Sequence, residues 1–238
     1  MGTVALLLAA GEGRRLGWAI PKAFVPVGGR PMVEYSLISM ADSGVIDAIV
    51  LVVPRTEHRR VESILSNLKG GSLVQNVVSG GTTRQASVRR GLDAVEETTE
   101  LVVCHDAARP FASPELFGRV LSGVHEADGA IPIVRAPDTV KRIQGNRVVE
   151  TLPREEIALT QTPQAFRAKA LRRAHDAAPP GEADATDDAV LLESVGLTVA
   201  TVDGEASNFK ITFPEDLAHA NERLAERSAR ARDRDPGG

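Results

Sequence analysis

The sequence is short of aromatic residues and has no large excess of either charge, and each shortage excludes a class of function. Its 238 residues include one tryptophan, one tyrosine and six phenylalanines. These are too few to build the stacking platforms of proteins that bind single-stranded nucleic acid. A net charge of −4 offers no electrostatic attraction for DNA, RNA or an anionic membrane. We therefore expect small-molecule substrates and neither a nucleic-acid nor a membrane partner.

Cysteine and long apolar runs are also scarce. Cys104 is the only cysteine, so no internal disulfide can form, and a reducing, cytoplasmic location is expected. No apolar run approaches the ~18 residues of a membrane helix. The first apolar run, residues 4–10, has no basic segment before it. It therefore predicts a buried strand rather than a secretion signal.

Short apolar runs alternate with amphipathic segments along the chain. The runs are continuous rather than alternating, as is typical of strands buried on both faces of a parallel sheet. Their order predicts a three-layer α/β sandwich with right-handed crossovers. The expected strands are residues 4–8, 48–53, 73–78, 101–104, 130–134 and 198–202, and the expected helices lie near 31–43, 57–68, 83–96, 114–126, 167–177 and 187–194, with a last one starting at Pro214.

Residues 136–159 interrupt this rhythm. Two short β-like pieces, 139–143 and 147–152, flank a turn at 144–146, which predicts a protruding hairpin arm. A lone hairpin is marginally stable in water, so we expect it to pack against something else, such as a second subunit.

The sequence also suggests where the domain and its helices begin and end. We find no interdomain linker, so a single domain is expected over residues 1–228, followed by a charged, disordered tail over 229–238. Thr82, with Gln85 three residues later, predicts a capping box. Ser113 before a proline predicts a second helix start.

A glycine-rich loop follows the first strand. Residues 6–17 read Leu-Leu-Leu-Ala-Ala-Gly-Glu-Gly-Arg-Arg-Leu-Gly. Small residues let the backbone approach a ligand and point its N–H groups at phosphate oxygens. The cations Arg14, Arg15 and Lys22 follow at once, and three positive charges suit a triphosphate. We therefore predict that a nucleotide contacts Ala9, Ala10, Gly11, Gly13 and Arg14.

Two better-known nucleotide motifs do not fit this loop. A Walker loop requires G-x-x-x-x-G-K-[ST], which nothing here matches. A dinucleotide fingerprint requires G-x-G-x-x-G and an acid ending the second strand, but Gly17 comes one residue late and the second strand ends without an acid. A nicotinamide-dependent reductase is thus a distant alternative, and an ordinary strand–turn with surface arginines is the plainest one.

The pattern over nearly the whole chain resembles the methylerythritol-phosphate cytidylyltransferases, a branch of the sugar-phosphate nucleotidyltransferases. The loop matches L-A-A-G-x-G-x-R, followed by Pro21-Lys22. Ala23 and Thr82 depart from the family, which often has glutamine and an acid there. The other matching segments are Gly80-Gly81 with Arg84-Gln85 and Ser87-Val88, residues 105–110, 138–141, 161–164, 186–188 and 208–212, and Pro214-Glu215-Asp216.

The resemblance implies a Rossmann-like fold and a reaction between CTP and 2-C-methyl-D-erythritol 4-phosphate in non-mevalonate isoprenoid biosynthesis. It implies that Arg15 and Lys22 are catalytic, and that the arm crosses to the other subunit of a homodimer. The implied contacts with the nucleotide also include Gly80, Gly81, Arg84, Ser87 and Ala107, and those with the sugar phosphate are Asp106, Arg109, Thr139, Lys141, Arg154, Thr162, Thr186 and Lys210.

Asp106 is also a candidate ligand for Mg²⁺. It ends a strand at the carboxyl edge of the sheet, where ligands bind in open α/β folds. Mg²⁺ prefers oxygen ligands and keeps its phosphates and waters. A loop aspartate that caps a turn is the alternative, and the family resemblance favours metal and substrate contact.

The sequence has no obvious catalytic histidine, and the implied reaction needs none. A phosphate monoester has a second pKa near ~6 and is already a nucleophile at neutral pH. Positioning and electrostatics would then carry catalysis. Cys104 and His105 are neighbours on a strand and should point to opposite faces. The remaining histidines, His58, His125, His175 and His219, fall in helical patterns and are expected to be solvated.

Two further functions stay open at this point. One is a cytidylyltransferase for a different polyol phosphate, such as ribitol 5-phosphate, with the same nucleotide machinery. The other is a nucleotide-binding sensor without catalysis. The joint presence of Lys22, Asp106 and Lys210 argues against the sensor, because binding alone would not need all three.

Overall fold

The centre of the molecule is a mostly parallel sheet. The computed structural model describes residues 2–178, 185 and 187–234, with only the backbone for 227–234. Within these residues the sheet has eight strands: Thr3–Leu8 (β1), Ala48–Val53 (β4), Val74–Ser79 (β5), Leu101–Asp106 (β6), Gly129–Arg135 (β7), Ala158–Thr160 (β10), Gln164–Arg167 (β11) and Val199–Asp203 (β12). Their order is β10-β7-β11-β6-β1-β4-β5, with β12 also on β7. Only β10 and β11 run antiparallel to their neighbours.

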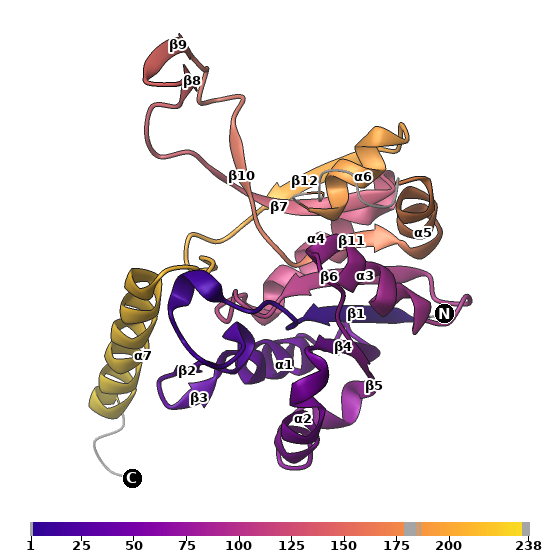
Figure 1. The fold of residues 1–238 in the computed structure, drawn as a ribbon, viewed down its shortest axis with the longest axis vertical. Helices are drawn as coiled ribbons and strands as arrows, with labels where there is room; N and C mark the ends of the chain where they lie inside the picture. Colours follow the sequence, from indigo (N-terminus) through magenta and orange to yellow (C-terminus); the bar gives the residue numbers. More distant parts are fainter. Residues whose placement is uncertain (1, 179–184, 186, 235–238) are drawn as a thin grey trace.

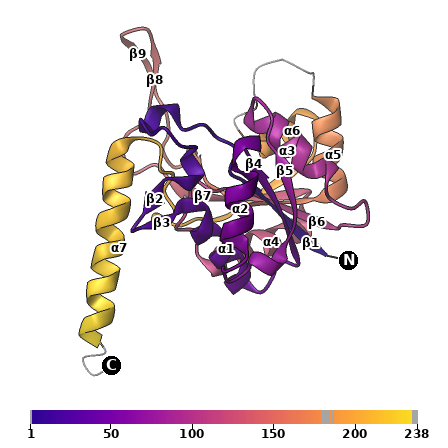
Figure 2. The ribbon, with the colours of Figure 1, turned by 60° about the horizontal axis from the view of Figure 1, so that its bottom comes forward.

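Helices cover both faces of the sheet (Figures 1 and 2). They span Met32–Ser43 (α1), His58–Leu65 (α2), Arg84–Asp93 (α3), Pro114–Gly123 (α4), Ala168–Ala177 (α5) and Asp188–Ser194 (α6). Helices α1, α2 and α4 join one apolar cluster with Leu7 and Val103 of the strands, while α3, α5 and α6 join a second with Leu6 and Val102. Successive strand residues thus face opposite layers, and the predicted three-layer α/β sandwich is confirmed.

The predicted arm is present as a separate two-stranded sheet. Strands Lys141–Gln144 (β8) and Arg147–Thr151 (β9) pair antiparallel around a turn in which Gly145 has a φ of 55°. Figure 1 shows this hairpin projecting well beyond the main sheet. Ile143 and Val148 stand opposite each other on the two strands, and both are more than 60% exposed.

The last helix lies at the margin of the molecule, away from the central sheet (Figures 1 and 2). Helix α7 spans Pro214–Arg234, so residues 229–234, for which the sequence predicted disorder, continue a helix; residues 235–238 lie outside the described part. The first turns of α7 pack on the small hairpin of Pro26–Val27 (β2) and Arg30–Pro31 (β3). Asn221 Oδ1 there accepts a hydrogen bond of 2.7 Å from the N–H of Gly28.

Strands β10 and β11 were not predicted from the sequence. Both are short, and β11 has no apolar periodicity that would separate it from the helix after it. Yet β11 lies between β6 and β7 and carries the fully buried Phe166. No helix in the described residues is long and apolar enough to cross a membrane.

Helix α3 begins one residue later than its sequence suggests. Its N-cap is Thr83, whose hydroxyl accepts a hydrogen bond of 3.1 Å from the N–H of Ala86, so the expectation that Thr82 is the cap was wrong. The predicted cap of α4 is confirmed, since Ser113 caps that helix, and α6 is capped by Asp187, whose side chain accepts a hydrogen bond from the N–H of Val190.

This difference between neighbouring threonines is testable. Thr83→Ala is expected to lower the free energy of unfolding by about 1 kcal/mol, because it leaves a helix N–H without its acceptor. Thr82→Ala is the matched control and should change it by less than about 0.5 kcal/mol. Urea unfolding followed by circular dichroism measures both. A greater loss in Thr82→Ala would contradict the assignment of the cap.

Candidate active site

Four parallel strands end together at one edge of the sheet, and their following loops meet there. The N–H of Ala9 donates to Val52 at 2.7 Å, and that of Gly80 donates to Val53 at 2.9 Å. The N–H of Ala107 donates to Leu8 at 3.0 Å. The glycine-rich loop after β1, the glycine pair after β5 and the end of β6 are therefore adjacent, as expected for the carboxyl edge of an open α/β sheet.

The glycine-rich loop folds back onto Lys22. Gly13 has a φ of 69°, and a Cβ there would lie 2.6 Å from that of Lys22. The N–H of Lys22 donates to the carbonyl of Gly11 at 3.2 Å. A glycine at position 13 is required both by the backbone conformation and by this close approach. The loop thus holds Lys22 beside the open backbone of Gly11.

The two arginines of this loop differ in surroundings. Arg15 stacks its guanidinium over the ring of Phe213 at 5.6 Å, which ties the loop to the segment before α7. Arg14 is highly exposed and donates from Nε to Glu12 at 2.6 Å. Arg15 is therefore held near Lys22, while Arg14 points its charge at a neighbour in the loop.

Lys22 lies in a crowded cationic environment. Burial, together with the nearby charges of Lys210 and Arg15, lowers its pKa from 10.5 to about 8 against the attraction of Asp106. Positive charges held this close repel one another, and a bound anion relieves the repulsion. A phosphate group would be such an anion.

Asp106 is shared by two cations. Arg84 Nε lies 3.2 Å from Oδ1, and Lys210 Nζ lies 2.7 Å from Oδ2. Burial alone would raise the pKa of Asp106, but Arg84, Lys210 and Arg109 hold it well below its usual range. The carboxylate is therefore ionised at neutral pH and orients both of its partners.

Arg109 and Thr162 hold the backbone of the site, and their expected contacts with the substrate stay a prediction. Arg109 donates to the carbonyls of Asn208 at 2.8 Å and Thr160 at 3.2 Å. The hydroxyl of Thr162 accepts a hydrogen bond of 3.0 Å from the N–H of Asp106 and lies 3.1 Å from Nδ1 of His105. Both side chains fix the strand ends around Asp106.

His105 and Cys104 point to opposite faces of β6, as predicted. His105 is fully buried and packs edge-on against Phe117, whereas Cys104 belongs to the other apolar cluster. Burial lowers the pKa of His105 to about 4, so its ring is neutral at pH 7. It is therefore part of the core and not an acid–base group of the site.

The glycine pair leaves almost no space for a side chain. A Cβ on Gly80 would lie 2.2 Å from that of Ala10, and one on Gly81 would lie 2.5 Å from that of Ala86. The N–H of Gly81 donates to the hydroxyl of Ser87 at 3.0 Å. A ligand that reaches this point meets bare backbone.

Several residues of the neighbourhood were not predicted from the sequence. Arg90 donates to the carbonyl of Gly80 and holds the glycine pair from outside. Asp188, which lies in a segment that matches the family but had no predicted role in the site, forms an ion pair with Arg84 at 2.8 Å. His175 is 2% exposed and contacts Asp188, so the expectation that it is solvated was wrong. No local pattern signals these contacts, since each joins segments far apart in the chain.

The predicted residues of the arm lie away from this edge within one chain. Lys141 donates to the hydroxyl of Thr151 at 2.6 Å, and Arg154 lies 3.3 Å from Glu155 on the surface. Thr139 is exposed beside them, and Figure 1 shows the arm projecting away from the sheet. Thr186 lies outside the described residues.

Asp106 does not fit a metal site formed by the protein. Both of its oxygens already face cations, and a divalent ion would be repelled by Arg84 and Lys210. In the described part of the chain, no three histidine, cysteine, aspartate or glutamate side chains are grouped to hold a metal. The predicted role of Asp106 as a protein ligand of Mg²⁺ therefore lacks support in this geometry.

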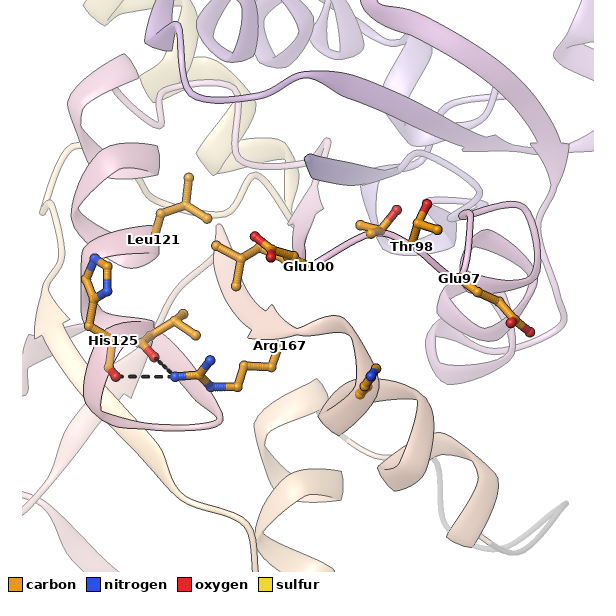
Figure 3. A pocket seen from close by; sticks show the side chains of 10 residues that line it. Glu97, Thr98, Glu100, Leu121, His125 and Arg167 are labelled. Atoms are coloured by element: carbon orange, nitrogen blue, oxygen red, sulfur yellow. Dashed lines mark hydrogen bonds between the residues drawn. The ribbon is translucent and has the colours of Figure 1, made fainter. Parts of the chain in front are cut away.

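A cavity of about 540 Å³ lies at the opposite edge of the sheet (Figure 3). It borders Leu101 at the start of β6, while Asp106 ends the same strand. Its Arg167 already donates to the carbonyls of Val124, His125 and Ala127. Ligands of open α/β sheets bind at the carboxyl edge, so this cavity is not the candidate site.

Known proteins resemble the chain over nearly its whole length. The family model of 2-C-methyl-D-erythritol 4-phosphate cytidylyltransferase (IspD) matches residues 3–226. The enzyme of that name from Geobacter metallireducens is 38% identical over 230 residues, covering 95% of this chain and 99% of that protein. The structure of 4-diphosphocytidyl-2C-methyl-D-erythritol synthase from Anaerococcus prevotii has a TM-score of 0.83 at 34% identity, covering 94% of this chain and 98% of the other.

Another relative is longer than this chain. The bifunctional enzyme IspD/IspF of Nitratidesulfovibrio vulgaris is 46% identical over 227 residues. The match covers 92% of this chain but only 57% of that protein. The chain thus spans just over half of the bifunctional relative.

The lowered pKa of Lys22 predicts a pH-dependent affinity for polyphosphate. In the protein without ligand, the ammonium group of Lys22 has a pKa of about 8, so it loses its charge as the pH rises from about 7 to about 9. Affinity for inorganic tripolyphosphate should therefore fall with rising pH. Lys22→Arg keeps its charge over this range and should show a smaller decline. Calorimetric titration measures the affinity of both proteins at each pH, and the comparison between them cancels the effect of ligand ionisation. Equal declines in affinity would rule out Lys22 as the titrating group.

Proposed function

The chain belongs to the 2-C-methyl-D-erythritol 4-phosphate cytidylyltransferase family, and we propose that it joins CTP to 2-C-methyl-D-erythritol 4-phosphate, releasing pyrophosphate. The product is 4-diphosphocytidyl-2-C-methyl-D-erythritol, in non-mevalonate isoprenoid biosynthesis. One observation carries this proposal: the glycine-rich loop, Lys22 and the Asp106–Lys210 pair meet at the carboxyl edge of one sheet. That edge offers cations to a triphosphate and to a second phosphate at once.

The reaction asks the protein for positioning rather than for proton transfer. An oxygen of the acceptor phosphate attacks the α-phosphorus of CTP, and a new P–O bond forms as the bond to the leaving pyrophosphate breaks. The attacking monoester is largely dianionic at neutral pH, so it needs no general base. In this proposal Lys22 and Arg15 stabilise the charge that develops on the pyrophosphate.

The acceptor phosphate would meet the other half of the cationic group. Lys210 is 41% exposed while its partner Asp106 is buried, so the amine can reach a ligand while the carboxylate holds it in place. Arg109 adds a positive charge near Asp106. Its guanidinium is held in place by hydrogen bonds to backbone carbonyls. This division assigns the leaving group to Lys22 and the incoming phosphate to Lys210.

The glycine pair is the proposed reader of the base. Gly80 and Gly81 present backbone groups where side chains would collide with Ala10 and Ala86. Main-chain donors and acceptors can pair with the edge of a pyrimidine, and a larger purine would overfill the space. The role of Ser87 would be to orient the N–H of Gly81, to which it is bonded.

Divalent cations enter this proposal only with the nucleotide. Mg²⁺ is commonly bound by substrate phosphates and water rather than by a cage of protein ligands. The cations around Asp106 leave it no free carboxylate oxygen. The proposed reaction therefore uses no metal held by side chains of the protein.

We further propose a homodimer in which the arm reaches the partner's site. Ile143 and Val148 form an exposed apolar pair on the hairpin, and a lone hairpin needs cover to be stable. Thr139, Lys141 and Arg154 would then approach the sugar phosphate in the partner subunit. A cytoplasmic location is also proposed, since the single cysteine, Cys104, is a buried free thiol.

A cytidylyltransferase for another polyol phosphate, such as ribitol 5-phosphate, is the second candidate. The nucleotide side of the site would be the same, and the two differ only in the acceptor. A pyrophosphate-release assay with CTP and each acceptor separates them. The second activity of the bifunctional relative is not proposed for this chain, which spans just over half of that protein.

Loss of Lys22 should remove catalysis without unfolding the chain. Lys22→Ala and Arg15→Ala are each expected to reduce turnover by about 10²–10³, because each removes a cation that meets developing charge. Lys69→Ala is the control, since Lys69 is exposed and paired with Asp42 far from the site. Pyrophosphate release measures turnover, and near-normal rates in both loop variants would refute the proposed mechanism.

The arm should control assembly. A charge in the apolar pair, as in Ile143→Glu or Val148→Glu, is expected to shift the protein from dimer to monomer, because it cannot be buried in an interface without a partner. Val45→Glu alters an exposed valine elsewhere and should leave the dimer intact. Light scattering after gel filtration gives the mass. A dimer in both arm variants, or a monomeric wild type, would count against this assembly.

A further inference from the structure

A row of alternating charges leads from the proposed active site into the core. Beyond Lys210 and Asp106, the row continues through Arg84, which donates from Nη1 to Oδ2 of Asp188 at 2.8 Å. The other oxygen of Asp188 lies 3.1 Å from Nε2 of His175. The row thus joins the segment before α7, the end of β6, and helices α3, α6 and α5.

The inner end of this row is closed to ligands. The side chains of Asp188 and His175 are 1% and 2% exposed, so neither can touch a substrate. Burial alone would raise the pKa of Asp188, but Arg84 and His175 hold it below its usual range. Asp188 is therefore a buried anion whose main partner is Arg84.

Asp188 fixes the orientation of Arg84. The guanidinium is planar, and its Nε and Nη1 are bound to two different carboxylates, so its position is set at two points. Its Nη2 is buried and has no hydrogen-bond partner among the described residues. Without Asp188, the guanidinium would have Asp106 as its remaining carboxylate and would compete there with Lys210.

We propose that Asp188, oriented by His175, is a positioning residue for nucleotidyl transfer. Through Arg84 it sets the carboxylate of Asp106, and through Asp106 it sets the amine of Lys210. This inference rests on the proposed function, because the position of Lys210 matters only if Lys210 meets the acceptor phosphate. It assigns a role in catalysis to two residues that no ligand touches.

The direct test is Asp188→Asn in the full chain, with steady-state pyrophosphate release. We expect kcat/KM for the acceptor to fall about 10- to 100-fold, as for residues coupled in one network. The KM for the acceptor should rise more than that for CTP, since Lys210 lies on the acceptor side. Asp176→Asn is the matched control: Asp176 is on the same helix as His175, is 81% exposed and pairs only with Arg89 in the described residues.

A double-mutant cycle tests whether Asp188 acts through Arg84. In an Arg84→Ala background, adding Asp188→Asn should change kcat/KM by less than about threefold, because the link is already broken. If the loss of kcat/KM in the double variant equals the product of the losses in the two single variants, the proposal is overturned. So would a wild-type acceptor KM in Asp188→Asn.

Two variants of His175 keep the proposal testable if Asp188→Asn does not fold. His175→Gln retains a side-chain donor near the place of Nε2, whereas His175→Leu does not. Acceptor KM should stay near wild type in the first and rise in the second, and equal KM values would overturn the proposal. Failure of the proposed function would look different, since the wild-type protein itself would then release no pyrophosphate with any acceptor.

Discussion

The pairing of Asp106 with Arg84 and Lys210 is the interaction on which the rest of the site depends. A carboxylate at the end of β6 is buried, and an isolated charge there would not remain ionised. The two cations keep it ionised, and it in turn holds them near each other and near Lys22. A net positive group can therefore form in a chain whose overall charge is −4. A binding site for phosphates needs such a local excess, which the composition alone would not suggest.

The topology of the sheet brings the segments that form this site close together. Asp106, the glycine-rich loop and the glycine pair belong to three segments separated by many residues, and parallel strands bring their ends to one edge. Backbone hydrogen bonds then fix each loop to the neighbouring strand. The scaffold is rigid where it positions cations, because Arg109 and Thr162 are bonded to the backbone there. Pre-organisation of this kind is the main contribution of a protein to phosphoryl transfer.

The sequence predicted the layers of the fold and the sheet edge where the candidate site residues gather, and missed contacts that depend on tertiary pairing. Continuous apolar runs located the parallel strands, because strands that are buried on both faces are apolar at nearly every position. Strand β11 was invisible, since four residues carry no period. His175 was expected in solvent because its helix pattern does not tell which neighbour covers it. Arg109 and Thr162 were identified as site residues from motif position, but their backbone partners, Asn208, Thr160 and Asp106, cannot be read from a motif.

The close approach of Gly80 to Ala10 limits how this site can change. The two residues lie in the loops that follow β5 and β1, and these loops approach each other although β4 lies between the two strands. Most binding pockets can be enlarged by exchanging a large side chain for a smaller one. Here one residue has no side chain and the other has a single methyl group, so nothing remains to be trimmed. A lineage or an engineer seeking room for a bulkier ligand at this point would have to move the backbone of one of the two loops.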